Sequence, residues 1–206
     1  MRRPVFVVSG VPRSGTSLVM ALLGAGGVAL LEDDARPPDA DNPFGYHEYA
    51  PVRRLATDSQ WVAHAEGHAV KVIHLLLPAL PRGPEYRVIL VCRDLREVVA
   101  SQDRMLARRG ENPGAVRGER LVAVLSAQLD QTRAWLREQP RISWMELDYD
   151  ALLCEPEVGL AKLIDFAGLR ATPRLLAALV RPDRVRERGE DEAGPAAGAA
   201  SPQGRR

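Results

Sequence analysis

The residues with the clearest chemical potential lie between positions 10 and 17, near the N-terminus. They read Gly10-Val11-Pro12-Arg13-Ser14-Gly15-Thr16-Ser17, between a β-branched and aromatic run at 5–8 and leucines that recur at helical spacing from Leu18 onward. A buried strand, a glycine-containing loop and a helix in this order direct backbone N–H groups and the positive end of a helix dipole toward one point. The segment therefore predicts a loop that binds a phosphate group.

This loop resembles a Walker A motif but lacks its lysine. Gly10 and Gly15 have the G-x-x-x-x-G spacing, Thr16 stands where the lysine belongs, Ser17 fills the hydroxyl position, and Arg13 is the cation. Nucleoside triphosphatases use that lysine on the β and γ phosphates. The loop thus disfavours ATP or GTP hydrolysis but not phosphate binding. The alternative is a plain turn that joins a core strand to a core helix.

A second pair of phosphate-binding candidates follows the apolar run at 86–92. Arg93 ends that run, and Ser101 lies eight residues later, about two helical turns on. A guanidinium fork and a hydroxyl donor suit one phosphate near the first loop. Spacing alone favours an ordinary alternative, in which Arg93 pairs with a carboxylate such as Asp94 and Ser101 lies on a helix surface.

Short apolar runs alternate with helical stretches along the chain, which predicts an α/β protein of three layers, α/β/α, with a central parallel sheet. Ligands of such sheets bind beyond the carboxyl ends of the strands. Strands are expected at 5–8, 69–73, 86–92 and 142–147, and helices after the first loop, after residue 48 through Leu55 to about Trp61, from Leu95, at 119–138, 148–153 and 156–168, and from Pro173 to about Val180.

Length and composition favour a single domain over residues 1–185, followed by a disordered tail at 186–206 that is rich in Arg, Glu, Gly, Pro and Ala. The net charge of +1 predicts no nucleic-acid partner. No apolar run is long enough to span a membrane. Cys92 and Cys154 have no metal-binding spacing and favour a reducing, cytoplasmic location, with Cys92 as a buried core thiol.

Taken together, these motifs resemble those of sulfotransferases that use 3′-phosphoadenosine 5′-phosphosulfate (PAPS). The segment 8–17 looks like the family's 5′-phosphosulfate loop, and 91–101 looks like its 3′-phosphate segment. Asn42-Pro43-Phe44-Gly45-Tyr46-His47-Glu48 and 147–156 resemble two further stretches of bacterial members. The resemblance covers about residues 4–180 and implies a P-loop-like fold, PAPS as co-substrate and no metal.

The resemblance also implies a role for each matching residue. Arg13 binds the 5′-phosphosulfate, with Gly15, Thr16 and Ser17 as N–H and hydroxyl donors and with Pro12 and Ser14 in the same loop. Arg93 and Ser101 hold the 3′-phosphate. Lys71, at the end of its strand, stabilises charge on the bridging oxygen; on its own, a lysine there is as compatible with an ammonium that extends to solvent.

Two residues are candidates for the base that takes the proton of the acceptor. Glu48 is the first, because it closes the 42–48 segment expected to enter the cleft. His74 is the second, three residues after Lys71, whereas animal cytosolic members place a histidine two residues after the corresponding lysine. The ordinary alternatives are a first-turn carboxylate for Glu48 and a surface residue at a helix start for His74.

The acceptor is expected to offer a hydroxyl or an amine, on a small molecule or a glycan. The chain lacks the Arg-Lys-Gly-x-x-Gly run of animal members and is short, which indicates a reduced acceptor pocket or a partner, as in a homodimer, that completes it. The alternatives are a non-catalytic nucleotide-binding module and a degenerate P-loop kinase or triphosphatase on the same fold.

Overall fold

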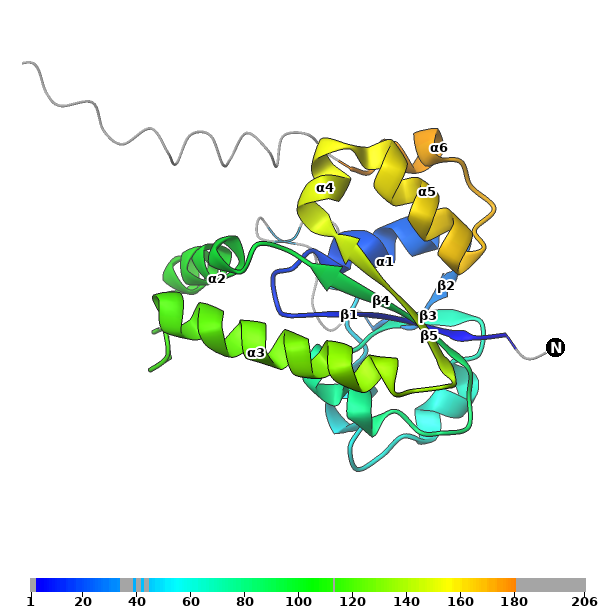
Figure 1. Cartoon of the computed structure of the whole chain (residues 1–206), viewed down its shortest axis with the longest axis horizontal. Coiled ribbons are helices and arrows are strands. Elements are labelled where there is room, and N and C mark those ends of the chain that lie inside the picture. The colour runs from blue at the N-terminus through cyan, green and yellow to red at the C-terminus, as the bar shows by residue number, and fades with distance from the viewer. Residues whose placement is uncertain (1–2, 34–38, 40–41, 43–44, 113, 181–206) are drawn as a thin grey trace, which may run out of the picture.

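A five-stranded parallel sheet forms the centre of the protein (Figure 1). The computed structural model describes residues 3–33, 39, 42, 45–112 and 114–180. The strand order is β2-β3-β1-β4-β5, and every pairing is parallel. The strands are β1 (Val5–Gly10), β2 (Ala29–Leu30), β3 (His68–Lys71), β4 (Tyr86–Cys92) and β5 (Ile142–Asp148).

The central strands are apolar on both faces because both faces are covered. All six residues of β1 are buried; Val5 and Val7 pack into one core and Phe6 and Val8 into the other. Alternation of side chains along a strand produces this division, and burial on both faces explains a continuous apolar run rather than an amphipathic one.

The helices form the two outer layers (Figure 1). One layer packs on the face of Phe6 and Val8 and contains α1 (Thr16–Ala25), α4 (Tyr149–Cys154), α5 (Pro156–Ala167) and α6 (Pro173–Ala177). The opposite core contains residues of α2 (Leu95–Arg109), α3 (Gly118–Arg137) and the 3₁₀ helices η1 (Ala50–Arg54), η2 (Gln60–His64) and η3 (His74–Ala79). The predicted three-layer α/β/α architecture is confirmed.

The single helix expected through Leu55 to Trp61 is wrong, because two short 3₁₀ helices occupy that region. Between them the side chains compete for the backbone: Thr57 donates to the Arg54 carbonyl, and Asp58 accepts from the N–H of Gln60. Such local bonds favour turns over a continuous helix.

The strand expected at 69–73 ends at Lys71, and the last helix ends at Ala177. The predicted tail at 186–206 lies outside the described residues.

The topology brings the chemically active segments to one edge of the sheet. β1 is the centre of the sheet, with β3 on one side and β4 on the other, so the chain changes direction of winding at β1. Ligands of open α/β sheets bind at such a point, beyond the carboxyl ends of the strands. Gly10, Lys71 and Cys92 are the last residues of β1, β3 and β4.

Among the described residues, no helix combines the length and apolar character that a membrane crossing requires.

Candidate active site

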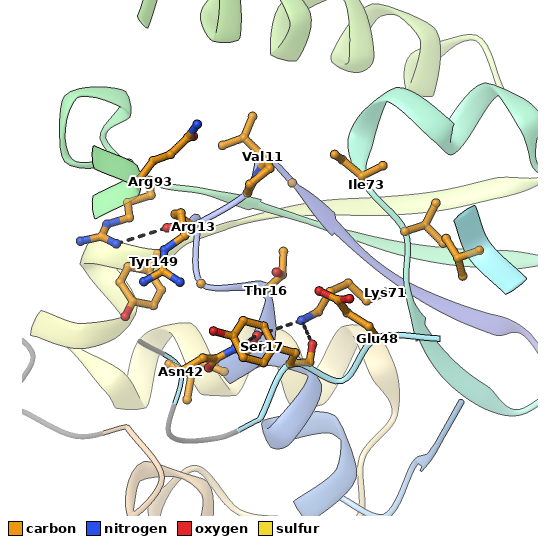
Figure 2. Close-up of a pocket in the computed structure, with 18 of the residues that line it drawn as sticks. Val11, Arg13, Thr16, Ser17, Asn42, Glu48, Lys71, Ile73, Arg93 and Tyr149 are labelled. Atoms are coloured by element: carbon orange, nitrogen blue, oxygen red, sulfur yellow. Dashed lines mark hydrogen bonds between the residues drawn. The ribbon is translucent and has the colours of Figure 1, made fainter. Parts of the chain in front are cut away.

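A cavity of about 510 Å³ opens at this edge of the sheet. Its walls come from the 10–17 loop, described residues between 42 and 53, the end of β3 with the residues after it, Arg93 with the middle of α2, and the start of α4. In Figure 2, Arg13, Arg93 and Tyr149 lie on one side of Thr16, and Lys71 and Glu48 lie on the other. The cavity therefore has two ends, one arginine-rich and one with a lysine and a carboxylate.

The 10–17 loop has the backbone of an anion-binding turn. Gly15 is the N-cap of α1 with φ of 99°, and neither a side-chain cap nor a first-turn carboxylate is present there. The backbone N–H groups of Gly15, Thr16 and Ser17 have no acceptor among the described residues, so the start of α1 is suited to an external anion. Arg13 also has a left-handed backbone, with φ of 71°, which is unusual for a residue with a side chain.

Glycine is required at position 15 for a second reason. A Cβ there would lie 2.1 Å from Cδ2 of Tyr149, the buried first residue of α4. The same tyrosine ring lies under the guanidinium of Arg93, 5.0 Å from its Cζ. Tyr149 therefore packs the first loop against the residue that follows β4.

Direct hydrogen bonds join the two predicted phosphate motifs. Nε of Arg13 donates to Oγ of Ser101 at 3.1 Å. An Arg93 N–H donates to the carbonyl oxygen of Arg13 at 3.2 Å (Figure 2). Ser101 is only 8% exposed, so the alternative of an ordinary surface serine is wrong. Arg93 does pair with carboxylates, Glu97 at 2.9 Å and Asp150 at 4.0 Å. Asp94 instead caps α2 by accepting from the N–H groups of Arg96 and Glu97.

At the other end of the cavity, Ser17 connects three segments of the chain. Its Oγ accepts from Nζ of Lys71 at 2.8 Å and from Nδ2 of Asn42 at 2.7 Å. Lys71 also donates to the carbonyl oxygen of Tyr46. The ammonium therefore lies at the start of α1 rather than extending to solvent.

The structure adds Asn42, Tyr46 and Tyr149 to the site, none of which the sequence identified as a site residue. Asn42 is buried, and the hydroxyl of Tyr46 donates to Asp39 at 2.7 Å. All three belong to stretches that carry the family resemblance, so the motifs themselves contained the signal.

Of the two candidate bases, Glu48 lines the cavity and His74 does not. Glu48 forms an ion pair with Arg53 at 3.1 Å. His74 begins η3 but is buried: its Nδ1 lies 3.2 Å from the carbonyl oxygen of Gly10, and its Nε2 lies 3.1 Å from Oε1 of Gln128. The ordinary alternative for His74, a surface residue at a helix start, is therefore wrong in its exposure, although His74 does begin a helix. Ile73 lines the cavity in the place that two-residue spacing from Lys71 would give to a histidine.

The remaining candidate residues of the 10–17 loop also differ in whether they line the cavity. Pro12, Gly15, Thr16 and Ser17 line the cavity. Ser14 does not: its side chain is fully buried, its hydroxyl has no partner among the described residues, and its N–H donates to the Val11 carbonyl.

Cys92 lies next to Arg93 but is half-buried rather than part of the interior. Its Sγ is 3.4 Å from Oε2 of Glu146, which forms an ion pair with Arg133 at 3.0 Å. Burial, together with the negative charge of Glu146, raises the pKa of the Cys92 thiol to about 11. The thiol is therefore protonated at neutral pH and is a poor nucleophile.

A sequence profile described as "Sulfotransferase domain" matches residues 3–184. The chain belongs to the sulfotransferase family. No curated protein matches this sulfotransferase in sequence. Its fold resembles that of sulfotransferase STF1 from Mycobacterium tuberculosis H37Rv, with a TM-score of 0.52, 15% identity, and coverage of 91% of this chain and 76% of that one.

Two further solved structures resemble the sulfotransferase less closely. The sulfotransferase domain from the curacin biosynthetic pathway has a TM-score of 0.48 and 16% identity, with coverage of 84% of this chain and 76% of that one. Mouse sulfotransferase SULT7A1, complexed with PAP, has a TM-score of 0.48 and 14% identity, with coverage of 95% and 69%. Family membership supports sulfuryl transfer as the general chemistry.

Proposed function

We propose that the protein transfers the sulfuryl group of PAPS to the hydroxyl of a small, largely apolar acceptor. The observation that carries this proposal is the pair of hydrogen bonds from Arg13 to Ser101 and from Arg93 to the Arg13 carbonyl. They unite two phosphate motifs, 88 residues apart, at one end of a cavity whose other end holds Lys71. A nucleotide with phosphates at both its 5′ and 3′ positions needs two such motifs.

The arginine-rich end suits the nucleotide. The N–H groups at the start of α1 and the guanidinium of Arg13 are placed to bind the 5′ phosphosulfate. We assign the 3′ phosphate to Arg93, which lines the cavity, and to Ser101, which does not line it but is bonded to Arg13, a residue that does. Thr16 in place of the Walker A lysine fits a phosphosulfate better than a triphosphate.

Lys71 and Glu48 have the charges that the reaction requires. PAPS supplies the sulfuryl group and leaves as 3′-phosphoadenosine 5′-phosphate (PAP). The acceptor oxygen forms the new bond to sulfur, and the electron pair of the broken S–O bond remains on the 5′ phosphate. The ammonium of Lys71, held by Ser17 and Tyr46, stabilises the charge that grows on that phosphate. The carboxylate of Glu48 accepts the proton of the acceptor.

The lining of the cavity favours an apolar acceptor over a glycan. Apart from the residues assigned to the nucleotide and to catalysis, most of its side chains are apolar or aromatic, among them Tyr49, Val52, Ile73, Leu76 and Met105. Small-molecule sites combine such surfaces with a few polar groups that fix orientation, whereas a sugar would leave most of its hydroxyls unpaired against them. Gln102 and Arg53 are polar side chains of the same cavity.

The direct test is transfer of ³⁵S from labelled PAPS to a panel of phenols, alicyclic alcohols and oligosaccharides, with Glu48→Gln as the paired variant. We expect labelled phenol or alcohol sulfates from the wild type, and a large loss of kcat with PAP affinity retained in the variant. PAP binding without transfer to any acceptor would instead indicate a non-catalytic nucleotide-binding module. Full activity of Glu48→Gln would exclude Glu48 as the base.

A further inference from the structure

His47 has a strained backbone between two residues of the site. Its φ is 48°, and Arg13 of the anion-binding loop is the only other non-glycine residue with a positive φ in the part of the chain that the structure describes. A residue with a side chain adopts this region only where its surroundings hold it there, and such positions concentrate at functional sites. Tyr46 on one side accepts from Lys71, and Glu48 on the other lines the cavity.

The contacts that hold His47 come from two acidic residues shortly after β2, Glu32 and Asp33. Nδ1 of His47 contacts Oε2 of Glu32. The N–H of Asp33 donates to the Glu48 carbonyl at 2.8 Å, and the Asp33 carboxylate accepts from the N–H of Ala50 at 2.5 Å. We call Glu32 and Asp33, with these contacts to residues 47–50, the acidic clip.

The acidic clip is itself attached to the central sheet. The N–H of Leu31 donates to the carbonyl oxygen of Ala69 in β3 at 2.8 Å, two residues before Lys71. The acidic clip therefore connects the backbone of Glu48 to β3, the strand that carries Lys71.

The imidazole of His47 has a single side-chain contact of this kind in the described part of the chain. Its Nε2 is buried and has no hydrogen-bond partner among the described residues. Nδ1 is therefore the ring atom through which Glu32 holds His47.

We propose that His47 and Glu32 form a positioning pair that sets the Glu48 carboxylate and the Tyr46 carbonyl at their distances from the reacting atoms. This inference rests on the proposed function, because it assumes that Glu48 and Lys71 act in sulfuryl transfer. Neither member of the pair lines the cavity, so the pair acts through its neighbours.

The test compares His47→Gly and Glu32→Ala with the wild type, using 4-nitrophenol as acceptor. Glycine tolerates the left-handed backbone, so His47→Gly removes the contact with Glu32 without adding strain. We expect kcat to fall about 10²-fold, the loss typical of a misplaced catalytic group, while the Kd for PAP stays within about twofold. His47→Asn, which tolerates the same backbone and keeps a donor, should recover part of the rate. His64→Gly, at an exposed histidine, is the matched control.

Hydrogen exchange followed by mass spectrometry provides a readout that needs no acceptor. Amides of residues 45–50 should exchange faster in His47→Gly and Glu32→Ala, with β1 and β4 unchanged. Unchanged exchange in 45–50, or a parallel loss of kcat and PAP affinity, would overturn the positioning pair. A wild type that transfers no sulfuryl group would refute the proposed function instead, and the exchange data would still decide whether the acidic clip exists.

Discussion

Nε of Arg13 donates a hydrogen bond to Oγ of Ser101 at 3.1 Å, across 88 residues of sequence. Arg13 belongs to the loop after β1, and Ser101 lies on the buried side of α2. The bond fixes the direction of a guanidinium whose backbone is already left-handed, so the loop and the helix form one cation-lined surface. A nucleotide bound at that surface would contact both elements at once.

Ser101→Ala should weaken PAP binding by about ten- to a hundredfold, since a hydrogen bond to a charged group contributes about 1.5–3 kcal/mol. The variant also leaves the guanidinium of Arg13 without its Ser101 acceptor. Calorimetric titration with PAP measures the effect. Ser126→Ala, at an exposed serine of α3, is the matched control and should bind PAP like the wild type. Equal affinities for both variants would remove Ser101 from the nucleotide site.

Gly15→Ala should destabilise the protein more than Gly27→Ala does. Both glycines have a left-handed φ, 99° and 92°, so alanine costs about 1–3 kcal/mol of backbone strain at either position. Only at Gly15 does the new methyl group meet Tyr149, at 2.1 Å, whereas nothing lies within 4 Å at Gly27. Urea denaturation of the two variants isolates the cost of this overlap. Equal losses of unfolding free energy would contradict the packing of Tyr149 under the loop.

Lys71→Met should lower kcat by about 10²–10³-fold, because it removes the cation that, in the proposed reaction, stabilises charge on the leaving phosphate. PAP affinity should change much less. The assay is ³⁵S transfer from PAPS to 4-nitrophenol, with PAP titration as the check that the site still folds. Lys162, exposed on α5, is the other lysine of the chain, and Lys162→Met should keep full activity. A Lys71→Met enzyme with normal kcat would exclude Lys71 from the chemistry.

The thiol of Cys92 should resist alkylation at pH 8, at which the exposed Cys154 reacts. Burial and the carboxylate of Glu146 raise the pKa of Cys92 to about 11, so little thiolate exists at pH 8. Iodoacetamide labelling followed by peptide mass spectrometry separates the two sites. Rapid labelling of Cys92 at pH 8 would show that its thiol is not held in the protonated form.

The same shift predicts how stability depends on pH. The native state binds the Cys92 proton more tightly than the unfolded chain, whose thiol has a pKa of about 8.5. Its contribution to stability is therefore complete below that value and is lost as the pH rises toward 11. Melting temperatures of the wild type should fall through this range, and Cys92→Ala should show a smaller fall. Parallel curves for the two proteins would exclude the effect.

The sheet and the glycine-containing loop after its central strand could be predicted from sequence because their signals are local. β1 and β4 are buried on both faces and so appear as continuous apolar runs, and Gly15 marks a loop that needs a left-handed residue. The prediction of one helix in the region 50–64 was wrong because hydrogen bonds of Thr57 and Asp58 to the backbone favour two short 3₁₀ helices over a continuous helix.

The direction of individual side chains could not be predicted, because tertiary packing decides it. Spacing put His74 near Lys71, but the imidazole lies between the Gly10 carbonyl and Gln128 of α3, away from the cavity. Spacing also left open which carboxylate pairs with Arg93. Asp94 caps α2, and the partners of Arg93 are Glu97 and Asp150, the second of which is 57 residues away. The contact of Glu32 with His47 joins residues 15 apart, and no local pattern indicates it.

Isothermal titration of the full chain with PAP in the absence of divalent metal, and with Mg·ATP in parallel, decides whether this cavity binds a nucleotide with 5′ and 3′ phosphates rather than a triphosphate. We expect PAP to bind with one site per chain, and Mg·ATP to bind much more weakly or not at all. Tight binding of Mg·ATP with no heat from PAP would refute the proposed nucleotide site.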